Sequence, residues 1–188
     1  EDTYYGDGLN LYTYCQNNPV YYIDPSGHKV CKRKYERYKK LRKLGLTAEE
    51  AHDFMKRANN VQGNAAKGQL GEELMDTIMK KNGYQQLPSK LKSNNGIDGV
   101  YVKYDSKGRI KELVVGEAKF GNSKLGMTSM GKQMDAQWIE GNVSKMRFLG
   151  ADKNVRAAGR ELYNYLGIKN PSKSGNYTAA VFRLRKSG

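Results

Sequence analysis

The chain has 188 residues, of which 33 are Lys or Arg and 19 are Asp or Glu, so its formal net charge is +14 at pH 7. This surplus favours a polyanionic partner, nucleic acid before anionic lipid, because basic side chains bind phosphate whatever the base sequence. No apolar run approaches the roughly 20 residues that span a bilayer, which excludes a transmembrane helix. Cys15 and Cys31 are too few for a disulfide framework and lack histidines at zinc-finger spacing.

The composition changes abruptly at residue 29. Residues 1–28 are rich in Tyr, Asn and Gly and nearly free of basic residues, whereas residues 29–43, KVCKRKYERYKKLRK, are basic with interleaved tyrosines. The second stretch predicts a helix that is either a solvated surface or an arm contacting phosphate. The chain begins with Glu rather than Met, which indicates a piece of a longer polypeptide.

Two further helices are predicted before the centre of the chain. Thr47 and Glu50 have the spacing of a capping box, so a helix is expected from residue 48 to about residue 59, with His52 as a surface or packing residue. Residues 67–81 form an amphipathic helix, and residues 85–95 are expected to be a loop. On that helix Glu72 lies at the edge of the apolar stripe and Glu73 points away from it, which makes Glu72 the half-buried one.

Residues 96–120 predict a β-hairpin with an acidic pair. A turn centred on Lys107 and Gly108 pairs residues whose numbers sum to 215, which sets Asp98 opposite Glu117. Side chains alternate along the second strand, so Glu117 and Lys119 share one face. Directly opposed side chains have Cβ atoms about 4.5–5.5 Å apart, a separation that suits two carboxylates holding one cation.

Such a pair repels itself unless a cation lies between the carboxylates, and a hard divalent ion such as Mg²⁺, or Mn²⁺, has the required oxygen preference. Lys119 beside it could orient or deprotonate an attacking water, or neutralise developing charge on phosphate. The alternative is an exposed cluster of charges on the open face of a sheet.

The remainder of the chain predicts two helices and a strand. After a Gly/Ser-rich connection over residues 121–131, the helices are expected at residues 129–148, with Trp138 in the core, and at residues 152–166. The strand is expected at residues 176–185. The fold class is therefore α/β, with an N-terminal basic helical segment.

The ordered set of Glu72, Asp98, Glu117 and Lys119 resembles the PD-(D/E)XK nuclease superfamily. GQLGE is similar to that family's GxxGE helix start, and GEAKF contains its E-x-K strand, although GIDG stands where the family has Pro-Asp. The resemblance implies a restriction-endonuclease-like core of helix, antiparallel hairpin, helix and strand. It also implies that a glutamate of the first helix completes the metal shell, Glu72 as the first choice and Glu73 as the second. A glutamine on the helix after the hairpin would lie near the scissile bond, and Gln133 fits this role better than Gln137.

Residues 5–28, YGDGLNLYTYCQNNPVYYIDPSGH, resemble the end of an RHS/YD-repeat core, the shell of bacterial polymorphic toxins. The resemblance divides the chain into the core's tail (residues 1–28), a basic helical linker (29–62) and a toxin domain (63–188). Asp24 matches an aspartate involved in self-cleavage in related cores, although a simple turn explains Asp24-Pro25-Ser26-Gly27 equally. The family further implies a repeat shell, a cognate immunity protein, and secretion or surface delivery to the cytoplasm of a target cell.

The expected function is metal-dependent hydrolysis of DNA phosphodiester bonds by a toxin of an interbacterial antagonism system. Asp98, Glu117 and Glu72 would hold the metal and Lys119 would position the nucleophile. Basic residues would add phosphate affinity that is independent of base sequence, among them Lys32, Arg33, Lys34 and Arg37. Two alternatives stay open: an RNase, such as a tRNA-cleaving toxin with the same site, and a non-catalytic basic module that binds nucleic acid.

Overall fold

The structure is a computed structural model and describes residues 32–91, 96–169 and 175–186. The predictions for residues 1–28, including Cys15 and Asp24, for Cys31 and for the side chains of Lys32 and Arg33 lie outside what it describes. The described residues fall into two compact units, one holding the residues up to Asn60 together with Lys186, the other Val61–Arg185. No helix among the described residues is long and apolar enough to cross a membrane.

In the described part of the first unit lie two helices, α1 (Lys32–Lys43) and α2 (Ala48–Asn60). The capping box is confirmed, because the Thr47 N–H donates to Glu50 Oε2 at 2.7 Å and the Glu50 N–H donates to Thr47 Oγ1 at 3.2 Å. His52 is a packing residue: it is buried, and its ring stacks on Tyr38 with centroids 4.6 Å apart. These contacts give the basic segment a small ordered core of its own.

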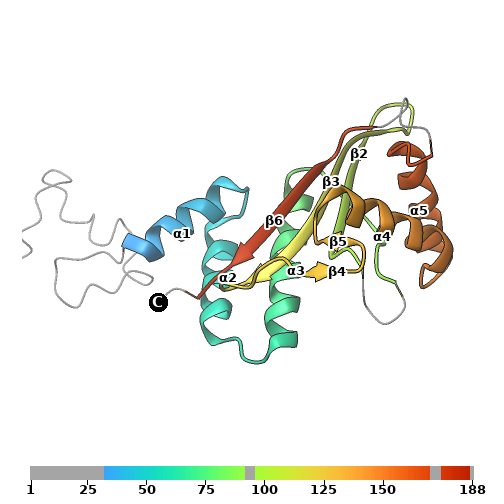
Figure 1. Ribbon diagram of the computed structural model, residues 1–188. Helices are drawn as coiled ribbons and strands as arrows, with labels where there is room; N and C mark the ends of the chain where they lie inside the picture. Colours follow the sequence, from blue (N-terminus) through green and yellow to red (C-terminus); the bar gives the residue numbers. More distant parts are fainter. Residues whose placement is uncertain (1–31, 92–95, 170–174, 187–188) are drawn as a thin grey trace, which may run out of the picture. The chain divides into compact units, whose positions relative to one another are not determined.

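The second unit is a mixed α/β structure built on a four-stranded sheet (Figure 1). Its elements are α3 (Asn64–Lys81), β1 (Gln85–Leu87), β2 (Gly99–Tyr104), β3 (Ile110–Phe120), β4 (Met127–Thr128), β5 (Gly131–Lys132), α4 (Ala136–Leu149), α5 (Lys153–Tyr165) and β6 (Thr178–Leu184). The sheet order is β1-β2-β3-β6, with β6 parallel to β3 and the other pairs antiparallel. The predicted α/β class is therefore confirmed.

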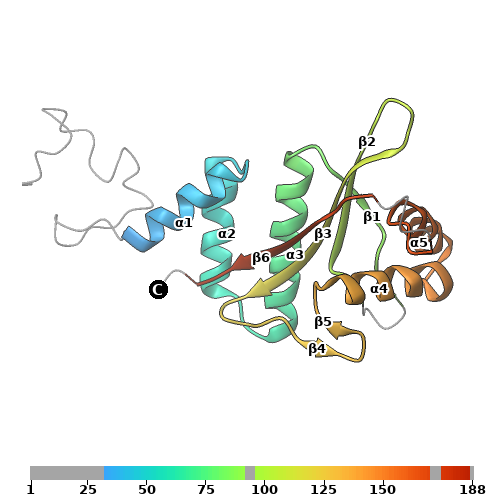
Figure 2. The same ribbon diagram turned by 45° about the horizontal axis from the view of Figure 1, so that its top comes forward.

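Helices cover both faces of the sheet (Figure 2). On one face Leu113 and Val115 of β3 pack with Trp138 and other buried residues of α4 and α5. On the opposite face Val114 packs with Met75 of α3. Alternation along one strand thus supplies two cores, and Trp138 is 3% exposed, as its predicted core position requires.

The hairpin has the predicted register, with a different turn. Gly99 pairs with Gly116 and Lys103 with Glu112, so these partners sum to 215, but Tyr104 pairs with Ile110. The turn closes through the Asp105 N–H, which donates to the Arg109 carbonyl at 2.8 Å, and the loop between them is one residue longer than predicted. A β-bulge on β3 beside Lys103 absorbs that extra residue, which restores the register before the strand reaches the acidic residues.

Three predictions about local structure are wrong. Residues 85–95 are not all loop, because β1 pairs with β2. The helix expected from residue 129 begins at Ala136, since β4 and β5 form a small hairpin across residues 127–132. As a consequence Gln133 precedes α4 rather than lying on a helix, and the backbone reverses beside it at Met134, whose φ is +73°.

Candidate active site

The acidic and basic residues of the hairpin meet at the end of the paired segment of β2 and β3. Glu117 and Lys119 lie on β3, and Asp98 directly precedes β2. One residue beyond the last hydrogen-bonded pair, the register places Asp98 opposite Glu117. The Ala118 N–H donates to Asp98 Oδ2 at 3.0 Å, and this bond anchors the Asp98 carboxylate against β3.

Glu117 is a buried carboxylate, with only 2% of its surface exposed. Its Oε1 accepts a hydrogen bond from Lys119 Nζ at 2.6 Å, whereas its Oε2 has no hydrogen-bond partner among the described residues. Asp98 lies within hydrogen-bonding reach of Glu117, but it satisfies Oε2 only when one of the two carboxyls carries a proton, since two ionised carboxylates cannot donate to each other. Buried carboxylate oxygens normally accept a hydrogen bond or contact a cation, and among the described residues Oε2 has neither kind of partner when both carboxyls are ionised.

The electrostatics of the pair follow from burial. Removal from water raises the pKa of the Glu117 carboxyl above its usual range, and the neighbouring Asp98 raises it further, while the Lys119 ammonium opposes both. A cation bound between Asp98 and Glu117 would favour the ionised form of both.

Lys119 is held in place by two acceptors. Besides Glu117, its Nζ donates to Gln133 Oε1 at 3.1 Å, and the same oxygen accepts from the Gly126 N–H at 2.8 Å. The side chain of Lys119 is 15% exposed. Gln133 thus links the lysine to the segment that leads into β4, and it makes this contact without being helical.

Glu72 approaches the same site from α3. Its side chain is 37% exposed, and residue 73 on the same helix is exposed, as the helical geometry predicted. Among the described residues, no hydrogen bond or ion pair joins Glu72 to Asp98 or Glu117. Instead Glu72 Oε1 accepts from Lys90 Nζ at 3.1 Å, and the same Nζ donates to Asp98 Oδ1 at 3.3 Å.

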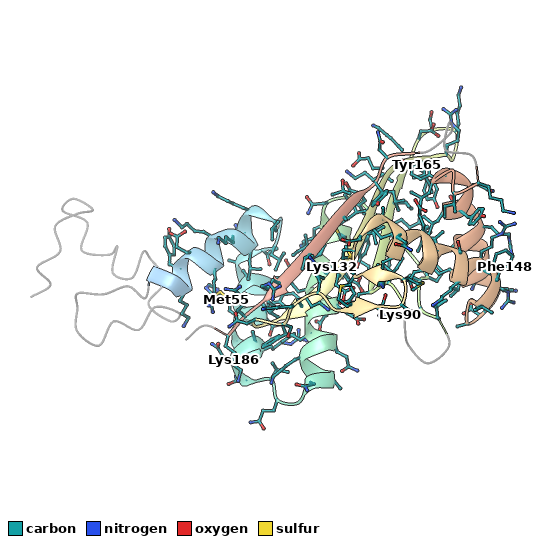
Figure 3. All side chains as sticks on the ribbon, viewed as in Figure 1. Met55, Lys90, Lys132, Phe148, Tyr165 and Lys186 are labelled. Carbon is teal, nitrogen blue, oxygen red and sulfur yellow. The ribbon has the colours of Figure 1, made fainter. Side chains whose placement is uncertain are left out.

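Lys90 was missed by the sequence reasoning. It lies between β1 and β2 in a stretch that reads as a polar loop, and its side chain is labelled in Figure 3. Its neighbour across an isolated β-bridge is Gly96, and this pairing returns the chain toward Asp98. A lysine in a loop carries no spacing signal, so only the fold reveals its place.

Asp98, Glu117 and Glu72 provide part of a binding site for a divalent cation. Asp98 and Glu117 offer oxygen ligands at one place, and hard cations such as Mg²⁺ prefer such ligands together with waters. Among the residues that the structure describes, no group of three or more His, Cys, Asp or Glu side chains is arranged as a ready-made metal site. Glu72 is separated from the pair by the Lys90 ammonium.

Comparisons with models of protein families, with curated proteins and with solved structures found no significant match to this chain. Function is therefore inferred from the site itself and from the motifs in the sequence.

Proposed function

We propose that the chain is a metal-dependent nuclease that hydrolyses phosphodiester bonds, with DNA as the preferred substrate. The observation that carries the proposal is the buried Glu117 Oε2, which has no partner among the described residues and lies beside a second carboxylate. A stable fold rarely leaves such an oxygen unsatisfied, and a site where it does is a candidate for function.

In this proposal the two carboxylates act as ligands. Asp98 and Glu117 would hold Mg²⁺ or Mn²⁺, with Glu72 assisting from α3. When bound, the ion would supply charge stabilisation to the phosphate and a more acidic water. Because the Ala118 N–H and Lys119 each hold one carboxylate oxygen, both carboxylates are fixed in orientation before a ligand arrives.

Lys119 would act on the reacting groups. Its ammonium is fixed between Glu117 and Gln133, so its position beside the carboxylates is defined. From there it can donate a hydrogen bond to a phosphate oxygen or orient the attacking water. Gln133 is a positioning residue for Lys119 in this scheme.

Two further features support a nuclease that acts on nucleic acid. The net charge of +14 supplies phosphate affinity that does not depend on base sequence. The element order from α3 through β1, β2 and β3, then the short β4–β5 hairpin, to α4, α5 and β6 supports the proposal of the restriction-endonuclease-like core that the motifs imply. Because residues 5–28 resemble the end of an RHS/YD-repeat core, we extend the proposal to an effector that follows an RHS-type shell, is delivered into the cytoplasm of a target cell, and is neutralised by an immunity protein in the producer.

The test is cleavage by the full 188-residue chain. Supercoiled plasmid and total RNA are incubated with the protein in Mg²⁺ or in EDTA, using wild type, Asp98→Asn and Glu117→Gln, with Glu73→Gln as a matched control on the exposed side of α3. We expect nicking of the plasmid in Mg²⁺ only, roughly 100-fold or more slower in the two site variants and unchanged in the control.

Each other outcome has a definite meaning. Cleavage of RNA alone would move the substrate to RNA, and retention of plasmid without cleavage would identify a binding module. Intact substrates in every lane, or equal cleavage by Asp98→Asn, would overturn the nuclease proposal.

A further inference from the structure

The four oxygens of Asp98 and Glu117 are not equivalent. Asp98 Oδ2 is held by the Ala118 N–H, and Glu117 Oε1 is held by Lys119. The two oxygens that these bonds leave free of backbone N–H and Lys119 are Asp98 Oδ1 and Glu117 Oε2, which makes them the first choice for a cation shared by the two carboxylates. Of these two oxygens, Glu117 Oε2 has no hydrogen-bond partner among the described residues, whereas Asp98 Oδ1 already contacts the ammonium of Lys90 at 3.3 Å.

We infer that Lys90 is an internal counter-cation that competes with the divalent metal for Asp98 and Glu72, and that its ammonium leaves these carboxylates when the metal binds. The inference rests on the metal site of the proposed function. Its basis is the place of the Lys90 Nζ, within 3.1 Å of Glu72 Oε1 and 3.3 Å of Asp98 Oδ1.

Simple geometry makes the two cations exclusive. Mg²⁺ binds oxygen at about 2.0–2.1 Å, so an ion on Asp98 Oδ1 would lie only a few ångströms from an ammonium on the same oxygen. Two positive charges at that separation repel, and the ammonium is on a flexible four-carbon stem that can move. The side chain of Lys90 is 31% exposed, so water is available to solvate it once released.

This role also explains how Glu72 contributes to the site through Lys90. With Lys90 in place, Glu72 and Asp98 share one positive charge. When Lys90 leaves, Glu72 loses its partner and becomes available to the incoming ion or its waters. The released ammonium then lies beside the site, where it can bind a phosphate of the substrate.

The experiment is titration of Mn²⁺ into the chelator-treated 188-residue chain by calorimetry. The variants are Lys90→Met and Lys90→Gln, with Lys107→Met as a control that removes the same charge from the exposed hairpin turn. We expect both Lys90 variants to bind Mn²⁺ on the order of tenfold more tightly than wild type, since the competing charge is gone. The control is expected to bind as wild type does.

A second measurement separates competition from a general change in charge. The side-chain ammonium resonance of Lys90, assigned by its loss in Lys90→Met, should be protected from exchange with water in the metal-free protein and should lose that protection when Mg²⁺ is added. Protection that persists with Mg²⁺ bound would overturn the inference.

The failures of the two proposals are distinguishable. If wild type binds Mn²⁺ and the Lys90 variants bind it equally or more weakly, the inference on Lys90 is wrong and the nuclease proposal stands. If neither wild type nor any variant binds Mn²⁺, both are wrong. Binding by the Lys90 variants alone would support the inference in its strongest form.

Discussion

Replacement of Lys119 by Met should destabilise the metal-free protein far more than the loss of a surface lysine. The Lys119 ammonium lies 2.6 Å from Glu117 Oε1, and the two side chains are 15% and 3% exposed. At an effective dielectric constant of about 20 the gross attraction is about 6 kcal/mol. Removing one partner of such a pair leaves a buried charge uncompensated, which typically costs about 3–5 kcal/mol.

The assay is urea unfolding in EDTA at neutral pH, followed by the fluorescence of Trp138. This residue is the single tryptophan of the chain and is buried in the second unit, so its signal reports unfolding of that unit. The matched control is Lys103→Met, which breaks a pair with Glu112 at 3.4 Å whose side chains are 33% and 41% exposed. We expect the control to cost less than about 1 kcal/mol.

The double variant Glu117→Gln/Lys119→Met isolates the cause. With both charges removed, only a hydrogen bond is lost, which contributes about 1 kcal/mol, so the double variant should be more stable than Lys119→Met alone. If Lys119→Met costs no more than Lys103→Met, or if the double variant is as unstable as the single one, the reasoning about a buried and compensated charge is refuted.

Three other predictions concern packing, pH and catalysis. A Cβ at Gly159 would lie 2.6 Å from a backbone carbonyl carbon of α4, so Gly159→Ala should lower the free energy of unfolding by about 3 kcal/mol or more. A Cβ at Gly68 would meet open space, so Gly68→Ala should raise the free energy of unfolding by about 0.5–1 kcal/mol. Thermal unfolding measures both changes. Burial lowers the pKa of His52 below its usual value of 6.5, so the folded protein should lose stability as the pH falls below 6.5, where the unfolded chain binds the proton more readily. The variant His52→Gln should flatten this slope in acid titrations followed by circular dichroism. Gln133→Leu should slow cleavage roughly 10- to 100-fold and leave Mn²⁺ binding unchanged, while Gln137→Leu should change neither the cleavage rate nor Mn²⁺ binding. Equal cleavage rates in the two variants would remove Gln133 from the proposed mechanism.

The sequence predicts the second unit well where hydrophobic periodicity is strong. The apolar stripe of residues 70, 74 and 78 marks α3, and alternation along β3 separates the residues that face α3 from those that face α4 and α5. The same alternation places Glu117 and Lys119 on one face. The register of the hairpin could be predicted although the turn could not. The predicted two-residue turn and the observed three-residue turn with a bulge give the same pairing of residues beyond the bulge.

Other features have no local signal. β1 is only three residues long and is a strand because it pairs with β2, so its sequence alone predicts a loop. The β4–β5 hairpin has two residues in each strand, and its Gly and Ser residues resemble a flexible connection. Lys90 enters the site through long-range packing, and tertiary contacts of this kind cannot be read from spacing.

The central claim is that Asp98 and Glu117 share one divalent cation, and anomalous diffraction from Mn²⁺-soaked crystals tests it most directly. The account predicts one anomalous peak within about 2.5 Å of Asp98 Oδ1 and Glu117 Oε2, absent in crystals of Glu117→Gln. A peak elsewhere, or none at saturating Mn²⁺, would contradict it.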